Sequence, residues 1–280
     1  MKQRIAYLPF VLLLAACSGK NGFHIPAEPA MVGIAAPLTL PVDTGTILLQ
    51  DYLVDVTQID SVSAVPGLKS TLSANKEKLA LVVDPAVIQP ISELQIWSKG
   101  DVYSLILKRS VKQKFVFSFD PKGLSYKTVQ IAGDINNWQP DQTQLTLDNG
   151  KWQKSMLLNP GNYSYQIVAD GKWMLDPNET ETKPNGMGGM NSVMKISAGK
   201  LDKAPILHTE SHSDGTVTIA AEQGVKEYFV VWENYRLPAE MLKSEGNKLI
   251  ITLPKEAASL DVSTLRVWGY NENGAGNDLL

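Results

Sequence analysis

Two tryptophans next to predicted turns are the residues whose position best suits binding chemistry in this 280-residue chain. Residues 163–169 follow the period of two that is typical of a strand with one buried face. Asp170-Gly171 is a hairpin signal directly after that strand, and it leads to Trp173. Trp138 follows the polar turn residues Asn136-Asn137. The pattern predicts a β-module that displays aromatic side chains near its turns.

A displayed indole offers a flat apolar face. The C–H groups of a sugar ring can lie on it, and each Å² of apolar surface removed from water is worth about 25 cal/mol. The amide of Asn191 can donate and accept hydrogen bonds at once, so it can pair with adjacent sugar hydroxyls. These residue types therefore favour sugar binding by stacking and hydrogen bonding.

The order of these residues over positions 113–198 resembles carbohydrate-binding module family 48. This is the glycogen- and starch-binding domain shared by AMP-activated kinase β subunits and many α-glucan hydrolases. The resemblance implies a small immunoglobulin-like sandwich in which Trp138 and Trp173 form the sugar platform. It also implies that Asn191 hydrogen-bonds glucose hydroxyls, and that the partner is an α-1,4-glucan polysaccharide or maltooligosaccharide.

Three further positions match the family's site and differ from it in residue type. The family tends to carry a lysine where this chain has Gln166, a leucine where it has Met187, and a threonine where it has Gly189. Gln166 and Met187 therefore complete the predicted carbohydrate-binding set.

Trp152 and Asn191 can also be explained by a structural role instead of sugar binding. Trp152 shares one strand face with Met156 and Leu158, which predicts a core side chain rather than a sugar platform. An isolated asparagine usually caps a turn, and the binding role of Asn191 depends on the resemblance alone.

The first residues have the pattern of a targeting segment. Lys2 and Arg4 precede an apolar run over residues 5–16, which is shorter than the about 20 residues that a membrane-spanning helix needs. Leu14-Ala15-Ala16-Cys17 resembles a bacterial lipobox. We therefore expect a lipoprotein signal peptide over residues 1–17.

This resemblance implies that Cys17 becomes the lipidated N-terminus, which makes the membrane a partner through the lipid anchor. Cys17 is also the only cysteine, so no intramolecular disulfide can form. Ser18 follows it instead of aspartate, which predicts the outer membrane of a bacterial cell envelope.

Strand-like runs and turn residues predict an all-β fold with three consecutive immunoglobulin-like β-sandwich domains after the signal peptide. Trp97, Trp232 and Trp268 lie in such runs and are predicted core residues. The expected segments are the signal peptide (1–17), a flexible tether (18–40), an N-terminal immunoglobulin-like domain (41–112), a glycogen/starch-binding module (113–199) and a third immunoglobulin-like domain (204–280).

Charge and polar clusters argue against other partners. Without Lys2 and Arg4, 24 basic and 29 acidic side chains give a net charge of −5, which does not suit nucleic acid. His208, Glu210 and His212 have strand spacing and should project from one face, as zinc ligands could. A polar edge strand explains them better, so we predict neither a metal site nor a cofactor.

We predict no catalytic residues in this chain. In the α-amylase family the catalytic carboxylates lie on loops of a barrel of about 250 residues, and three sandwiches leave no room for one. The chain ends at Leu279-Leu280 as if a further domain should follow. We therefore expect the N-terminal accessory region of an exported family 13 hydrolase, with a catalytic barrel in cis or in trans. Two alternatives are a stand-alone starch-capture lipoprotein of a polysaccharide-uptake system and a structural spacer without sugar affinity.

Overall fold

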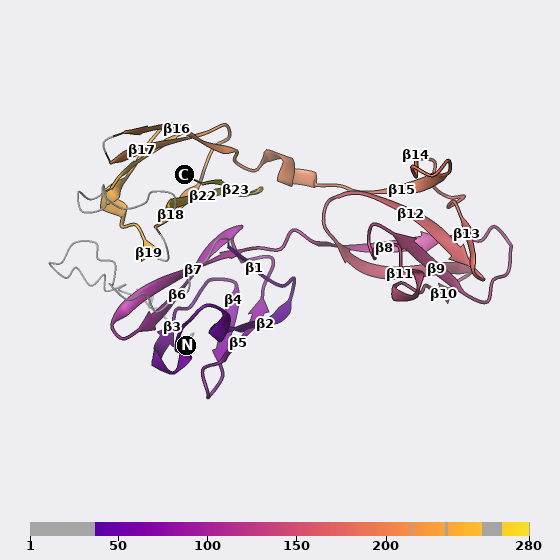
Figure 1. Ribbon diagram of the computed structural model, residues 1–280, viewed down its shortest axis with the longest axis horizontal. Helices are drawn as coiled ribbons and strands as arrows, with labels where there is room; N and C mark the ends of the chain where they lie inside the picture. The colour runs from indigo at the N-terminus through magenta and orange to yellow at the C-terminus, as the bar shows by residue number, and fades with distance from the viewer. Residues whose placement is uncertain (1–36, 214, 233–234, 254–264, 280) are drawn as a thin grey trace, which may run out of the picture.

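The computed structural model describes residues 37–213, 215–232, 235–253 and 265–279 (Figure 1). The predictions for the signal peptide and for lipidation of Cys17 fall outside these residues. The described part consists of strands, turns and short 3-10 helices, and the prediction of an all-β fold of immunoglobulin-like sandwiches is confirmed. Within the same residues, no helix is both long and apolar enough to cross a membrane.

The first unit contains two sheets, ordered β1-β7-β6-β3 and β2-β5-β4, whose facing apolar side chains form one core. Its strands are β1 (Leu38–Thr39), β2 (Thr44–Leu48), β3 (Ile59–Val62), β4 (Leu68–Leu72), β5 (Lys78–Val83), β6 (Ile91–Ser98) and β7 (Asp101–Lys108). Its 3-10 helices are η1 (Leu49–Asp51) and η2 (Val56–Gln58). The packed part begins before residue 41, because β1 pairs with β7 and Leu40 is buried in the core.

The middle unit also has two sheets. One is ordered β10-β11-β8, and the other is ordered β13-β12-β15-β14 with β9 paired to β12. The strands are β8 (Gln113–Phe119), β9 (Val129–Gly133), β10 (Thr146–Asp148), β11 (Lys151–Leu158), β12 (Gly161–Ala169), β13 (Lys172–Met174), β14 (Thr182–Pro184) and β15 (Met190–Ile196), with η3 at Pro140–Gln142. Trp152 is buried in the core between the sheets, as predicted.

The third unit repeats this architecture with sheets β16-β17-β21-β20 and β19-β18-β22-β23. Its strands are β16 (Leu207–Ser213), β17 (Thr216–Ala221), β18 (Glu227–Trp232), β19 (Tyr235–Arg236), β20 (Leu242–Glu245), β21 (Lys248–Thr252), β22 (Leu265–Asn271) and β23 (Gly274–Leu279). The 3-10 helices are η4 (Gly199–Lys203) and η5 (Ala239–Met241). Trp232 belongs to its core, as predicted.

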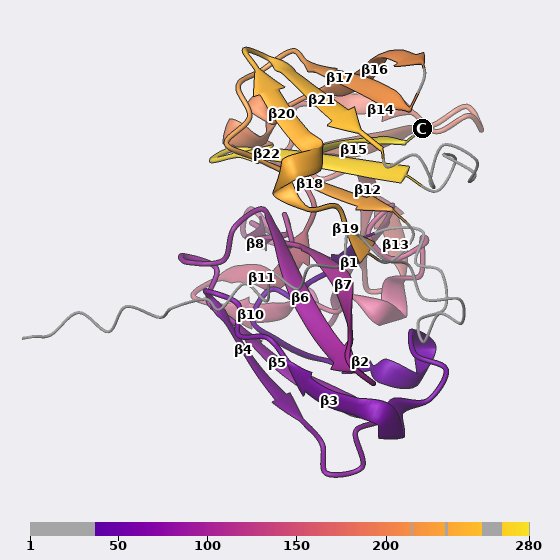
Figure 2. The same cartoon turned by 90° about the vertical axis from the view of Figure 1, so that its left-hand side faces the viewer.

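The first and third units pack against each other (Figures 1 and 2), while the middle unit lies apart from them (Figure 1). A separate cluster of buried apolar residues joins them, formed by Ile91, Ile106, Phe229, Val231, Trp268 and Tyr270. Arg236 of the third unit forms an ion pair with Glu93 of the first, with an Nη1–Oε2 distance of 3.1 Å, and stacks 4.0 Å above the Phe229 ring. Trp268 is therefore buried as predicted, but between two units rather than inside one.

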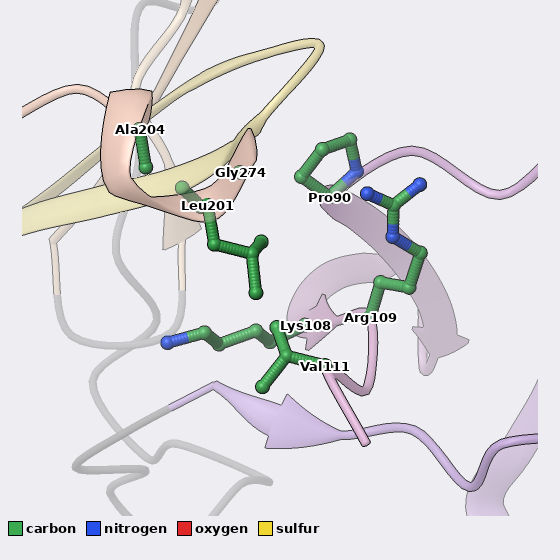
Figure 3. A pocket seen from close by; sticks show the side chains of 8 residues that line it. Pro90, Lys108, Arg109, Val111, Leu201, Ala204 and Gly274 are labelled. Carbon is green, nitrogen blue, oxygen red and sulfur yellow. The ribbon is translucent and has the colours of Figure 1, made fainter. Parts of the chain in front are cut away.

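Two connecting segments lead to the middle unit and meet at one place on the paired units. Figure 3 shows this junction, a cavity of about 140 Å³ in which Leu201 of η4 points toward Lys108 and Val111. The Asn271 side-chain amide donates to Lys203 O at 2.9 Å, and Arg109 N donates to Pro90 O at 3.0 Å. These bonds hold both segments against the paired units where they depart.

The prediction that Trp97 is a core residue is wrong. Trp97 is half-buried, whereas Leu94 and Ile96 of the same strand are fully buried in the core. Alternation along β6 turns odd-numbered side chains away from that core. Among the described residues, the third unit contacts this outer face around Ile91 and Glu93.

The prediction that His208, Glu210 and His212 project from one face is also wrong. A β-bulge between Thr209 and Ser211 shifts the register, so His208 pairs with Ala220 but His212 pairs with Val217. Neighbouring residues along β17 face opposite sides, and the bulge therefore separates the two imidazoles. Glu210 instead binds Lys248, with an Oε1–Nζ distance of 2.6 Å. In the described part of the chain, no group of three His, Cys, Asp or Glu side chains could hold a metal ion.

Candidate functional site

The side chains of strand β12 point to two sides of its sheet, one of which faces the core of the middle unit. Its residues Tyr165, Ile167 and Ala169 enter the core. Gln166 and Val168 therefore point the other way, because successive strand residues alternate. We call the sheet surface to which they point the distal face.

The strand register brings predicted site residues to the distal face. Trp173 of β13 is the partner of Val168, so it shares that residue's side of the sheet. Val193 of β15 is the partner of Ser164 on the same side, and Asn191 lies two residues before it. Segments far apart in the sequence thus place Trp173, Gln166 and Asn191 on one surface.

Trp173 is displayed by the predicted hairpin turn. Asp170 and Gly171 have φ values of 48° and 78°, the left-handed conformations that a tight two-residue turn requires, and Trp173 is 49% exposed. The Asp170 carboxylate accepts bonds from Thr128 N at 2.8 Å and Lys127 N at 2.9 Å. The hydrogen bond from Thr128 is the largest cause that lowers the pKa of Asp170 below its ordinary value. These bonds hold the turn against the segment that precedes β9.

Trp138 lies at the end of a turn that one buried side chain organises. Asn136 Oδ1 accepts from Gly133 N at 3.0 Å, and its Nδ2 donates to Ile131 O at 2.8 Å and to Gln139 O at 2.9 Å. Trp138 is half-buried and has a φ of 62°, which is rare for a bulky residue. The bonds of Asn136 and the bond from Trp138 N to Gly133 O, at 3.0 Å, hold it there.

Sequence reasoning treated Asn136 only as a polar turn residue and missed its role in positioning. The available signal was the Asn-Asn pair directly before a tryptophan, since asparagine commonly bonds the backbone of its own turn.

Met187 stands at the tip of the loop between β14 and β15 and is 88% exposed. Asn185 Oδ1 accepts from Met187 N and from Gly189 N, both at 2.9 Å, which closes the loop on itself. Gly186 and Gly188 supply the left-handed conformations on either side of Met187. Sequence reasoning missed Asn185, although the Asn-Gly pair is a turn signal.

Asn191 does not cap a turn, because it lies within β15 opposite Lys183. It is 6% exposed, and its Oδ1 accepts a hydrogen bond from Gln166 Nε2 at 3.0 Å. The same Nε2 donates to Met190 O at 3.0 Å. The two amides that were predicted separately are therefore in direct contact.

A buried tyrosine–aspartate pair supports the distal face from the core side. Tyr165 Oη donates to Asp176 Oδ2 at 2.8 Å, and Asp176 also accepts from Asn178 N at 2.8 Å. Burial, followed by the bond to Asp176, raises the pKa of the Tyr165 phenol far above its ordinary value. Asp176 N donates to Ser192 Oγ of β15 at 2.9 Å. The pair thus fastens the chain just after Trp173 to the middle of the sheet.

Replacing Tyr165 by phenylalanine should lower the unfolding free energy of the middle unit by about 1–3 kcal/mol, because it removes one partner from a buried carboxylate. Urea denaturation followed by tryptophan fluorescence measures the change. Tyr163→Phe is the matched control, since the Tyr163 hydroxyl makes an exposed bond to Asn159 O, and it should have a smaller effect. Equal effects of the two variants would contradict this account of Asp176.

Comparison with known proteins bears on this same part of the chain. Residues 115–202 match the family model for the glycogen recognition site of AMP-activated protein kinase. A 70-residue segment is 27% identical to the 5'-AMP-activated protein kinase subunit beta-1 of Sus scrofa. This match covers 25% of the chain and 55% of that relative, so the chain spans about half of the relative's length. Both matches support a carbohydrate-binding domain of family 48 type in the middle unit.

Similar solved structures include maltogenic amylase from S. marinus, with 16% identity over 60% of this chain and 28% of that one and a TM-score of 0.32. Sidekick-1 immunoglobulin domains 1–4 cover 89% of this chain and 74% of that one, with 10% identity and a TM-score of 0.20. The SGBP-B protein of a Bacteroides ovatus mixed-linkage glucan utilization locus, in complex with a heptasaccharide, covers 82% of this chain and 69% of that one, with 9% identity and a TM-score of 0.22.

Proposed function

We propose that the middle unit binds α-1,4-glucan, such as starch, glycogen or maltooligosaccharides, without catalysis. The observation that carries this proposal is the meeting of Trp173, Gln166 and Asn191 on the distal face, within the segment that matches the glycogen-recognition model. Trp173 supplies an apolar platform for a glucose ring, and the two amides supply hydrogen bonds to its hydroxyls. Trp138, on the turn after β9, and the exposed Met187, on the loop between β14 and β15, complete the proposed site with further apolar surface.

The wider setting of this binding is part of the same proposal. The predicted lipid anchor at Cys17 would hold the protein at the bacterial outer membrane, and the predicted partner is a family 13 hydrolase with its barrel in cis or in trans. Lys2, Arg4 and the lipobox support the anchor, and the family resemblance supports the hydrolase.

The affinity of a single site should be modest. A shallow surface encloses little of its ligand, so we expect a Kd between about 1 μM and 1 mM, or roughly −8 to −4 kcal/mol. A lipid-anchored population that meets a polymer with many repeated sites gains strength from multivalency. Useful capture of starch would then depend on the anchor as well as on the site.

A starch pull-down tests the proposal. Insoluble starch should retain the wild-type protein, while Trp138→Ala and Trp173→Ala should each weaken retention at least tenfold, because each removes a sugar platform. Circular dichroism confirms that the variants are folded.

Leu157→Ala is the matched control for Trp173→Ala. Leu157 has the same 49% exposure but lies on strand β11 of the other sheet, so its loss should leave retention unchanged. A wild-type protein that starch does not retain, and that shows no heat of binding with millimolar maltoheptaose, would overturn the proposal and favour a structural spacer.

A further inference from the structure

The contact between Gln166 and Asn191 determines which way both amide groups point. Met190 O is a backbone carbonyl and can only accept a hydrogen bond. The Gln166 atom 3.0 Å from it must therefore be the donor Nε2. That same Nε2 lies 3.0 Å from the Asn191 side chain, so the Asn191 atom facing it must be the acceptor Oδ1. One backbone carbonyl thus sets the orientation of two side chains.

This orientation leaves one donor and one acceptor unused. Among the described residues, neither Asn191 Nδ2 nor Gln166 Oε1 has a hydrogen-bond partner. Neither atom is among the fully buried side-chain atoms that lack a partner, so both keep contact with solvent. Both belong to side chains on the distal face that carries Trp173.

We infer that Gln166 is a positioning residue that turns the Asn191 amide so that Nδ2 faces the ligand, while its own Oε1 stays open beside it. The pair then presents one N–H donor and one C=O acceptor side by side. Such a pair matches two neighbouring hydroxyls of a glucose unit, one accepting from Nδ2 and the other donating to Oε1. This inference rests on the proposed glucan binding and specifies the polar half of that site.

The chemistry of the pair explains why the donor at position 166 matters. A carboxylate there cannot donate to Met190 O or to Asn191 Oδ1. It would repel both oxygens and draw Asn191 Nδ2 toward itself, away from the ligand. An ammonium group at position 166 could still donate to both oxygens, but it would lack the open acceptor.

The test measures maltoheptaose binding by calorimetry for the wild type, Gln166→Glu, Gln166→Lys, Asn191→Ala and the double variant with Gln166→Glu and Asn191→Ala. We expect Gln166→Glu to weaken binding more than tenfold and Gln166→Lys to weaken it about threefold. In the Asn191→Ala background, Gln166→Glu should add less than a threefold loss, because the residue it positions is already absent. Gln153→Glu on β11 makes the same change of charge on the other sheet and should leave the affinity unchanged.

A second readout does not require sugar. In side-chain amide NMR spectra of the unliganded protein, the Asn191 signals should shift in Gln166→Glu and stay close to their wild-type positions in Gln166→Lys. The positioning role would be overturned if Gln166→Glu bound maltoheptaose like the wild type, or if the two losses were additive in the double variant. Either result would leave the proposed glucan binding in place. Absence of wild-type binding would overturn both, and unchanged Asn191 signals in Gln166→Glu would overturn the orientation by itself.

Discussion

Replacing Gly133 by valine should unfold the middle unit and abolish starch retention. A Cβ atom at this position would lie 2.2 Å from Ser164 O and 2.7 Å from Tyr165 Cβ, where β9 pairs with β12. The clash involves the backbone of a central strand, so no side-chain rotation relieves it, and we expect a loss of about 3 kcal/mol or more. Gly133 also closes the turn that carries Trp138, because its carbonyl accepts from Trp138 N.

Differential scanning calorimetry of the full chain checks this prediction. The core of the middle unit is separate from the cores of the other two units. The unfolding transition of the middle unit should therefore move to lower temperature, while the transition of the paired units stays at its wild-type temperature. Gly224→Val is the matched control, since a Cβ at position 224 meets nothing within 4 Å and should leave starch retention intact. A stable Gly133→Val protein that still retains starch would contradict the claim that the close packing of Gly133 against β12 requires glycine.

Replacing Trp268 by alanine should destabilise the paired first and third units by about 3–5 kcal/mol. Trp268 is buried in the cluster that joins the two units, and its truncation leaves a cavity in this cluster, which contains Ile106 of one unit and Phe229 of the other. We expect a lower unfolding temperature for the paired units and a more extended particle in small-angle X-ray scattering.

The middle unit provides an internal reference for the Trp268 prediction. Its core shares no residue with the cluster, so maltoheptaose affinity should stay at the wild-type value. Trp97→Ala removes a half-buried tryptophan outside the cluster and should cost less. The role of Trp268 in joining the units would be contradicted if Trp97→Ala lowered the unfolding temperature as much as Trp268→Ala does. A loss of maltoheptaose affinity in Trp268→Ala would contradict the independence of the middle unit.

Dividing the protein into paired outer units and a separate middle unit has a consequence for binding. The two connecting segments are held at one junction by Arg109 N and by the Asn271 amide. The middle unit, which carries the distal face, is therefore attached to the paired units at this junction, away from the interface around Arg236. This arrangement suits the proposed capture of a polymer, because a long chain needs an unobstructed approach.

Local sequence patterns predicted the display of Trp173. Asp170-Gly171 encodes its turn by backbone preference alone, and the alternation over residues 163–169 encodes which face enters the core. Trp152 was likewise recognisable as a core residue from its strand neighbours. These features depend on residues within a few positions of each other, so the sequence carries them directly.

Long-range pairing decided what the local patterns could not. The contact between Gln166 and Asn191 joins residues 25 positions apart, and the ion pair between Glu93 and Arg236 joins residues 143 positions apart. The bulge in β16 separated two histidines that spacing alone had placed on one face.

The sequence by itself determined the all-β class and the turns that carry Trp138 and Trp173, because backbone preference, local side-chain hydrogen bonds and side-chain periodicity act over a few residues. Only the tertiary structure decided that the first and third units pack together and that two amides orient each other. These contacts form when strands distant in the chain come together in one sheet or at one interface, and no local pattern specifies which strands meet.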